Sequence, residues 1–175
     1  MIDYTNVPSP SFVLEAARLK TNLELIRSVQ ERTGVQVILA LKGFSMWRMF
    51  PMISGYLHGA TASSLFEARL IYEEMGVKAH TYSPAYLPDE FSRIMRYSSH
   101  ITFNSVAQYL RYREELALSE ERISPGLRVN PLYSEVETQL YNPAAPGSRL
   151  GITPEHLASG LPEGVEGLHA HTLCE

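Results

Sequence analysis

The sequence has 175 residues, of which 45% are hydrophobic and 19% are charged, and its formal net charge is -4. This balance excludes the strongly basic surface that nucleic-acid binding requires, and no apolar stretch approaches the roughly 18 residues that cross a bilayer. The amino terminus has no basic segment followed by an apolar core. We therefore expect a cytoplasmic protein that binds neither nucleic acid nor membrane, and the single cysteine agrees with a reducing compartment.

The first part of the chain is predicted to contain an extended segment, a helix and an apolar strand. Residues 12–14 are expected to be extended because they follow Pro8 and Pro10. Apolar residues at helical spacing predict a helix over residues 15–32. The continuous apolar run over residues 37–41 predicts a strand that is buried on both faces of a parallel sheet.

Strand and helix patterns alternate through the rest of the chain, which predicts parallel βα units and an α/β fold. Ser105 is placed to cap a helix, because its hydroxyl can accept a hydrogen bond from a free first-turn amide. The further strands are expected over residues 59–63, 79–82, 100–103, 127–129 and 167–172, and the further helices over residues 48–54, 65–75, 88–97 and 106–116.

Lys42 stands alone at the end of the apolar strand and is followed at once by Gly43. In a parallel sheet this position lies at the carboxyl end, where barrels and open α/β sheets place their chemistry. A partly desolvated amine there is readily neutral and can attack an aldehyde such as that of pyridoxal 5'-phosphate. By position alone, the alternative is a strand-end lysine that reaches solvent.

Several segments resemble known enzymes. Residues 9–44, which include Ala40-Leu41-Lys42, resemble the opening of the fold-type III superfamily of alanine racemase and ornithine decarboxylase. A closer resemblance lies in four segments: Asn130-Pro131-Leu132-Tyr133-Ser134-Glu135-Val136-Glu137-Thr138, Leu140-Tyr141-Asn142-Pro143, Pro146-Gly147-Ser148-Arg149-Leu150-Gly151 and Gly167-Leu168-His169-Ala170-His171-Thr172-Leu173-Cys174-Glu175. Through these segments the chain resembles the carboxynorspermidine (carboxyspermidine) decarboxylase family of that superfamily.

The resemblance implies a pyridoxal-phosphate-dependent enzyme of polyamine biosynthesis that decarboxylates carboxynorspermidine or carboxyspermidine, and a homodimer with shared active sites. It implies a partial TIM (β/α)8 barrel over residues 15–175, with residues 1–14 leading in from a second β domain that is mostly absent. Because a complete barrel takes about 250 residues, we expect the chain to be the amino-terminal half of a longer enzyme. A self-sufficient smaller α/β domain is the alternative.

The same resemblance assigns catalytic roles to Lys42 and His171. Lys42 is expected to bind the cofactor covalently, and His171 is expected to stack on its pyridine ring. Because alternate residues of a strand point to the same face of the sheet, His169 and His171 share a face. Spacing alone therefore does not decide which of the two stacks on the ring. A hydrogen-bonded core histidine is the alternative, and two histidines without a third ligand define no metal site.

Three more residues are expected to bind the cofactor. Arg128 lies inside an apolar strand, where a buried unpaired guanidinium would be costly. The resemblance places Arg128 near the cofactor and makes Glu67 its candidate partner, with a purely structural ion pair as the alternative. It also implies that Cys174 lines the site near the cofactor phosphate.

Residues 130–149 are predicted to form a long loop, since they contain four prolines or glycines and no helical period. Long connections in compact domains are usually functional or disordered. On a barrel this loop lies over the catalytic face, where Glu135 and Glu137 are expected to bind a cationic substrate. Two solvated glutamates in a mobile loop are the alternative.

Other functions stay open at this point. One group comprises diaminopimelate, ornithine or arginine decarboxylases and amino-acid racemases, and residues 130–151 argue against it. The other is a non-catalytic pyridoxal-phosphate-binding protein of similar barrel fold. That family lacks a β domain, whereas the extended residues 10–14 suggest one here.

Overall fold

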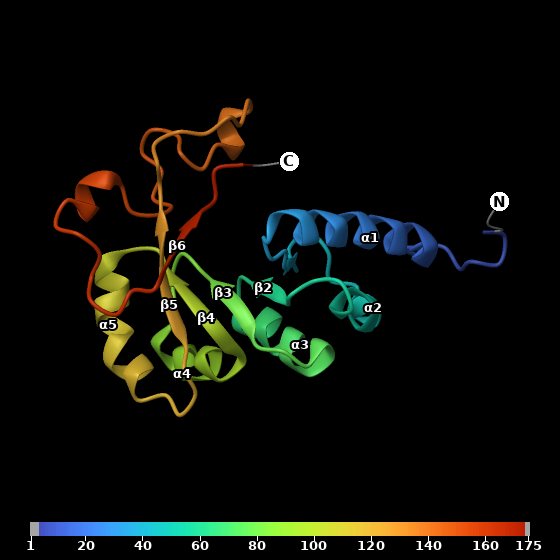
Figure 1. Cartoon of the computed structure of the whole chain (residues 1–175), viewed down its shortest axis with the longest axis horizontal. Coiled ribbons are helices and arrows are strands. Elements are labelled where there is room, and N and C mark those ends of the chain that lie inside the picture. Colours follow the sequence, from blue (N-terminus) through green and yellow to red (C-terminus); the bar gives the residue numbers. More distant parts are fainter. Residues whose placement is uncertain (1–3, 174–175) are drawn as a thin grey trace.

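Six parallel strands lie side by side in chain order. The computed structural model describes residues 4–173. Each strand pairs with the next, and the sheet curls like part of a β/α barrel (Figure 1), which confirms the predicted α/β class. The strands are β1 (Leu39–Ala40), β2 (Ala60–Ala62), β3 (Ala79–Tyr82), β4 (Ser98–Phe103), β5 (Ser124–Val129) and β6 (Gly167–Ala170).

Helices connect most of these strands, as parallel pairing requires. The α-helices of the described residues are α1 (Ala16–Thr33), α2 (Phe50–Ser54), α3 (Leu65–Met75), α4 (Pro88–Tyr97) and α5 (Val106–Ala117), and the short 3-10 helices are η1 (Trp47–Met49), η2 (Gln139–Tyr141) and η3 (Pro154–Leu157). The single helix expected over residues 48–54 is instead η1 followed by α2, whose first turn contains Pro51. Within residues 4–173, no helix combines the length and apolar character of a membrane span.

Helices α3 and α5 begin with the same local arrangement. The Ser64 hydroxyl accepts a hydrogen bond of 3.2 Å from the Glu67 amide, and the Glu67 carboxylate accepts one of 2.6 Å from the Ser63 amide. Ser105 caps α5 in the same way, by accepting from the Gln108 amide at 3.1 Å. The predicted cap at Ser105 is therefore confirmed, and each such cap stabilises its helix by about 1 kcal/mol.

The core lies between the helices and the outer face of the sheet. Phe91 of α4 and Phe103 of β4 are completely buried, and Phe91 stacks on Tyr112 of α5 with ring centroids 3.9 Å apart. A second cluster around Phe50 and Ile71 joins α2 and α3 to the same face. Burying each large apolar side chain contributes roughly 1.5–3 kcal/mol, so this packing fixes the strands that carry the site.

The inner face of the sheet carries polar side chains in rows that the strand register sets. His80 pairs with His100 across β3 and β4, and Arg128 pairs with His169 across β5 and β6. The imidazole rings of His80 and His100 stack with centroids 3.9 Å apart. Burial, and to a smaller extent the charge of His100, lowers the pKa of His80 to about 4. Ionisable groups therefore gather on the inner face, opposite the apolar core.

Residues 12–14 lie outside the helices and the six strands of the described residues. Phe12 is 98% exposed, and none of the described strands runs beside this segment. An extended segment needs a neighbouring strand for its backbone hydrogen bonds, and here it has none. The membership of residues 1–14 in a second β domain stays a prediction, and residues 1–3 lie outside the described residues.

Candidate active site

Lys42, Arg128 and His171 line one cavity of about 280 Å3. They come from the ends of three different strands: Lys42 follows β1, Arg128 lies near the end of β5, and His171 follows β6. The carboxyl ends of parallel strands meet at one edge of a barrel, which explains why residues so distant in the sequence converge. The same cavity is lined by Ser63, Tyr82, Pro84, Tyr141, Pro143 and Leu150.

Lys42 occupies a turn directly after β1. The amides of Gly43 and Phe44 both donate to the Ala40 carbonyl, at 3.0 and 3.1 Å, and this turn carries Lys42 away from the strand. Lys42 is exposed, whereas the sequence predicted a partly desolvated amine, and β1 is an edge strand of the described sheet. Within residues 4–173 it forms no salt bridge, so its amine is free to meet a ligand.

Arg128 is the buried cation of the site, with 5% of the residue exposed. Its Nη1 donates a hydrogen bond of 2.8 Å to the Tyr82 hydroxyl, and the guanidinium carbon lies 4.9 Å from the centre of the Tyr82 ring. No carboxylate of residues 4–173 forms a salt bridge with it. A buried guanidinium without a counter-charge is unfavourable by itself and suits a site that receives an anion.

The predicted pairing of Arg128 with Glu67 is wrong. The Glu67 carboxylate bonds the Ser63 amide, and the Glu67 amide bonds Ser64, so the side chain closes the first turn of α3. Glu67 does not line the cavity that Lys42 and Arg128 share. The local capping arrangement therefore uses the carboxylate that the resemblance assigned to the cofactor site.

The structure distinguishes the two histidines that spacing left equivalent. His171 lines the cavity with Lys42, whereas His169 lines an adjoining hollow of about 430 Å3 on the inner face of the sheet. The His169 ring meets the Tyr82 ring edge-on at 5.1 Å. Burial, with smaller contributions from Arg128, His171 and Lys42, lowers the pKa of His169 to about 4. Burial also lowers the pKa of His171, so both rings are neutral at neutral pH.

Sequence reasoning missed Tyr82 and Asn104. Tyr82 is the last residue of β3, and Asn104 follows the last residue of β4. The Tyr82 hydroxyl donates to Asn104 Oδ1 at 2.9 Å and accepts from Arg128. Their position at strand ends, shared with Lys42, was the only signal in the sequence that could have found them.

The connection from β5 to β6, residues 130–166, is here called the β5–β6 loop. It contains only η2 and η3, as expected of a segment without a helical period. Tyr141, Pro143 and Leu150 of this loop line the cavity, whereas Glu135 and Glu137 are exposed and do not. The Glu135 carboxylate accepts a hydrogen bond of 3.0 Å from the Tyr133 hydroxyl. The substrate-binding role of the two glutamates stays a prediction.

Cys174, expected to bind the cofactor, lies outside the described residues. In the part of the chain that the structure describes, no group of three or more histidine, cysteine, aspartate or glutamate side chains is placed to hold a metal ion.

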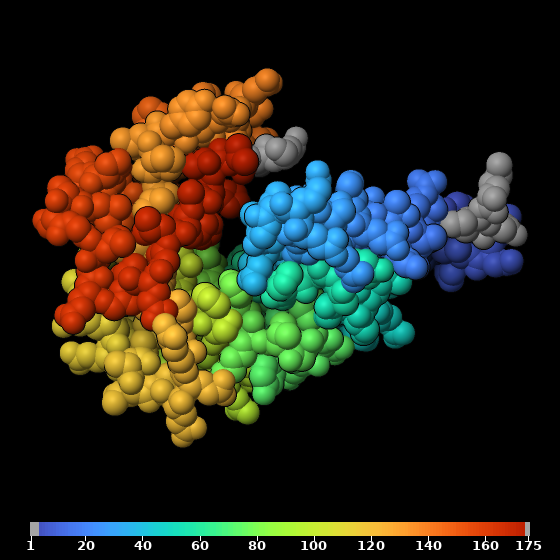
Figure 2. Space-filling view, viewed as in Figure 1, coloured from blue at the N-terminus to red at the C-terminus, as the bar shows by residue number. Residues whose placement is uncertain are grey.

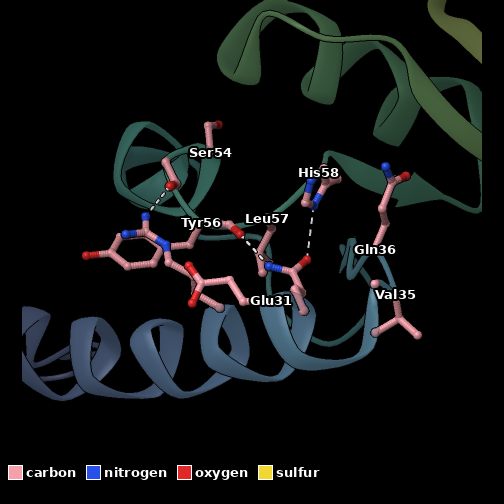
Figure 3. A pocket seen from close by; sticks show the side chains of 11 residues that line it. Glu31, Val35, Gln36, Ser54, Tyr56, Leu57 and His58 are labelled. Carbon is pink, nitrogen blue, oxygen red and sulfur yellow. Dashed lines mark hydrogen bonds between the residues drawn. The ribbon is translucent and has the colours of Figure 1, made fainter.

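A larger hollow of about 510 Å3 lies away from these residues, between the end of α1 and residues 54–58 (Figure 3). The Gln30 side chain makes three polar contacts with the segments around this hollow. Its Nε2 donates to the Tyr56 carbonyl at 2.9 Å, and its Oε1 accepts from the Val37 amide at 2.7 Å. The same Oε1 lies 3.0 Å from His58 Nδ1. The Arg27 guanidinium stacks 4.0 Å above the Tyr56 ring. These contacts hold α1 against Val37 and residues 54–58, which gives the polar groups of this hollow a structural role.

The curled parallel sheet, with a cavity at the carboxyl ends of its strands, is that of part of a β/α barrel. No family model matches the sequence. The chain is 48% identical over 171 residues to carboxyaminopropylagmatine decarboxylase of Synechocystis sp., covering 98% of this chain and 44% of that protein. It is 40% identical over 172 residues to carboxynorspermidine/carboxyspermidine decarboxylase of Campylobacter jejuni, with the same shares covered.

Two further comparisons agree. The chain is 32% identical over 169 residues to carboxynorspermidine/carboxyspermidine decarboxylase of Herminiimonas arsenicoxydans, covering 97% of this chain and 45% of that protein. Its structure matches the crystal structure of C. jejuni carboxynorspermidine decarboxylase complexed with norspermidine, with a TM-score of 0.83 and 38% identity over 96% of this chain and 42% of the other. The predicted resemblance is thus confirmed, and the chain spans less than half the length of these relatives.

Proposed function

We propose that the protein is a pyridoxal-phosphate-dependent decarboxylase that converts carboxynorspermidine or carboxyspermidine to norspermidine or spermidine. The observation that carries this proposal is the convergence of Lys42, Arg128 and His171 on one cavity at the carboxyl ends of the strands. The similar proteins are named decarboxylases and match nearly the whole of this chain, which supports the same reaction class. We further propose a cytoplasmic homodimer with shared active sites.

The residues of the cavity fit the cofactor. Its volume of about 280 Å3 is near the lower end of small-molecule sites, which start at roughly 300 Å3. Lys42 offers an amine without a salt-bridge partner, and Arg128 offers a buried positive charge that no described carboxylate neutralises. Amine, guanidinium and flat neutral imidazole suit an aldehyde, an anionic group and an aromatic ring, respectively.

Each side chain then has a defined task. The Lys42 amine would hold the cofactor through its aldehyde. His171 would pack against its flat ring and orient it, while Arg128 would bind an anionic oxygen at the wall of the cavity. When bound, the cofactor supplies a conjugated ring that accepts the electrons left by departing carbon dioxide.

The β5–β6 loop is proposed to recognise the cationic part of the substrate. Its Glu135 and Glu137 are exposed and belong to the same loop as the cavity-lining Tyr141. A triamine presents several ammonium groups, so two carboxylates on a neighbouring loop would attract it. The crystal structure of the C. jejuni relative is a complex with norspermidine, which agrees with a polyamine ligand.

Carboxyaminopropylagmatine is a second candidate substrate. The observation in its favour is the 48% identity to carboxyaminopropylagmatine decarboxylase of Synechocystis sp., compared with 40% and 32% to two carboxynorspermidine/carboxyspermidine decarboxylases. An agmatine-derived substrate ends in a guanidinium, which a carboxylate can bind through two parallel hydrogen bonds. The reaction at Lys42 is the same for both candidates.

The test is carbon dioxide release by the full protein, supplied with pyridoxal phosphate, from the three carboxylated polyamines and from ornithine, diaminopimelate and arginine. We expect the carboxylated polyamines to react with a higher kcat/KM than the amino acids, by at least about 100-fold. Preference for an amino acid would reassign the enzyme within its superfamily. Cofactor binding without any carbon dioxide release would identify a non-catalytic cofactor-binding protein.

A further inference from the structure

The side-chain amide of Asn104 joins three segments beside the cavity. Its Oδ1 accepts hydrogen bonds from the Tyr82 hydroxyl at 2.9 Å and from the Gly151 amide at 2.8 Å, and its Nδ2 donates to the Arg149 carbonyl at 2.8 Å. These bonds fix the orientation of the amide, because only the oxygen accepts and only the nitrogen donates. Asn104 therefore ties the ends of β3 and β4 to the β5–β6 loop.

Tyr82 extends this connection to Arg128. The guanidinium of Arg128 donates to the Tyr82 hydroxyl at 2.8 Å. Within residues 4–173 this is the one hydrogen bond that the Arg128 side chain makes. Burial raises the pKa of Tyr82 above its ordinary value, although the hydrogen bond and the charge of Arg128 oppose the change. The phenol thus keeps the proton that it donates to Asn104.

The β5–β6 loop also approaches Arg128 directly through its backbone. The Ile152 amide donates to the Arg128 carbonyl at 2.9 Å, and the Asn130 amide donates to the Ile152 carbonyl at 2.8 Å. Gly151 has a φ of +86°, and a Cβ at this position would lie 3.1 Å from Arg128 Cγ. The positive φ and the close contact both favour glycine here, and they bring the loop against the strand that carries the arginine.

We propose that Tyr82 and Asn104 are positioning residues that order the Arg128 guanidinium and the β5–β6 loop together. The loop supplies Tyr141, Pro143 and Leu150 to the cavity, so its position and that of the guanidinium decide jointly whether the cavity fits its ligand. Without the Tyr82 hydroxyl, the guanidinium loses its side-chain partner. Without the Asn104 amide, the loop loses two bonds and Tyr82 loses its acceptor. This inference takes one thing from the proposed function, namely that the anionic ligand of the cavity is pyridoxal phosphate.

The first measurement is the dissociation constant of pyridoxal phosphate for the full protein and its Tyr82→Phe, Asn104→Ala and double variants. Tyr82→Phe keeps the ring that contacts His169 and Arg128 and removes only the hydroxyl. We expect each single variant to raise the dissociation constant by about tenfold, because Tyr82→Phe removes a hydrogen bond to a charged group and Asn104→Ala removes the acceptor of Tyr82 and two bonds to the loop. The loss of binding free energy in the double variant should be smaller than the sum of the losses in the two single variants, because both changes break the same connection.

The second measurement needs no cofactor. Chymotrypsin can cut the β5–β6 loop after Tyr133 or Tyr141, and we expect Asn104→Ala to speed this cleavage about tenfold because the loop is released from β4. Tyr112→Phe is the matched control, since its hydroxyl donates to the Tyr86 carbonyl at 3.1 Å inside the core. This control should lower the melting temperature and leave both measurements unchanged.

The two measurements separate this inference from the proposed function. If the unaltered protein does not bind pyridoxal phosphate, the proposed function is wrong and loop cleavage alone decides: faster cleavage of Asn104→Ala supports the inference, and an unchanged rate overturns it. If the protein binds the cofactor, the inference is overturned when Tyr82→Phe and Asn104→Ala stay within about twofold of the unaltered protein in both affinity and cleavage.

Discussion

Arg128 donates a hydrogen bond of 2.8 Å to the Tyr82 hydroxyl, yet it forms no salt bridge with any carboxylate of residues 4–173. With 5% of the residue exposed, its charge has lost most of its contact with water. The fold therefore bears a desolvation cost that an anionic ligand would offset. This relationship links the stability of the ligand-free protein to its ability to bind.

Replacing Arg128 by methionine should separate stability from binding. Methionine fills a similar apolar space without a charge, so we expect the free energy of unfolding of the ligand-free protein to stay constant or rise by about 1 kcal/mol. The dissociation constant of pyridoxal phosphate should rise by at least about tenfold. Urea denaturation and cofactor titration measure the two quantities. A loss of several kcal/mol with unchanged affinity would mean that Arg128 is purely structural.

His171→Ala and His169→Ala should have different effects, although the two residues are two positions apart. Because His171 lines the cavity with Lys42, its removal should weaken cofactor binding and lower kcat by about tenfold or more. His169→Ala removes the ring contact with Tyr82 and should mainly lower stability, by about 1 kcal/mol. Turnover and melting temperature of both variants decide the matter. Equal turnover in the two variants contradicts the assignment of His171.

Stability should fall as the pH is lowered through the titration range of the buried histidines. The pKa of His80 and that of His169 are lowered to about 4 in the folded protein, whereas an unfolded histidine titrates near 6.5. Between these values the unfolded chain binds protons that the folded chain does not, so acid favours unfolding. The free energy of unfolding should therefore decrease from about pH 6.5 to about pH 4.

His80→Phe tests the origin of that slope. Phenylalanine can still stack on His100 but does not titrate, so the variant should show a shallower decrease in stability with falling pH. His156→Phe is the control, because His156 is exposed and bonds only its local helix turn through Thr153. A slope unchanged by His80→Phe would show that other groups cause the acid sensitivity.

Glu67→Ala should destabilise the protein by about 1 kcal/mol and leave cofactor affinity unchanged, because the carboxylate closes the first turn of α3. Glu67→Gln keeps an acceptor for the Ser63 amide and should retain most of the stability. Urea denaturation and cofactor titration again give the two values. Weaker cofactor binding by Glu67→Ala would restore the original assignment of this residue to the site.

Much of the sheet was predictable from the sequence. An apolar run that is followed by glycine or a polar residue marks a buried parallel strand. Phe12, in the segment that Pro8 and Pro10 predict to be extended, is exposed and belongs to none of the described strands, so its place in a second β domain stays a prediction. Glu67 was paired with Arg128 although its local pattern, a serine three residues before a glutamate, is a visible capping signal. Lys42 was singled out by its position at the end of an apolar strand and then by resemblance, whereas His171 came from resemblance. Tyr82 and Asn104 were missed because a polar residue at a strand end acquires its partners only when neighbouring strands align.

The central claim is that Lys42 carries the cofactor. Borohydride reduction of the full protein with pyridoxal phosphate, followed by peptide mass analysis, should place the label on the peptide that contains Lys42. Lys42→Ala should lose the label and the cofactor absorbance. Lys78→Ala should keep both, since Lys78 forms a salt bridge of 2.7 Å with Glu121 away from the cavity. A label that persists in Lys42→Ala, or that maps to another residue in the unaltered protein, would contradict the account.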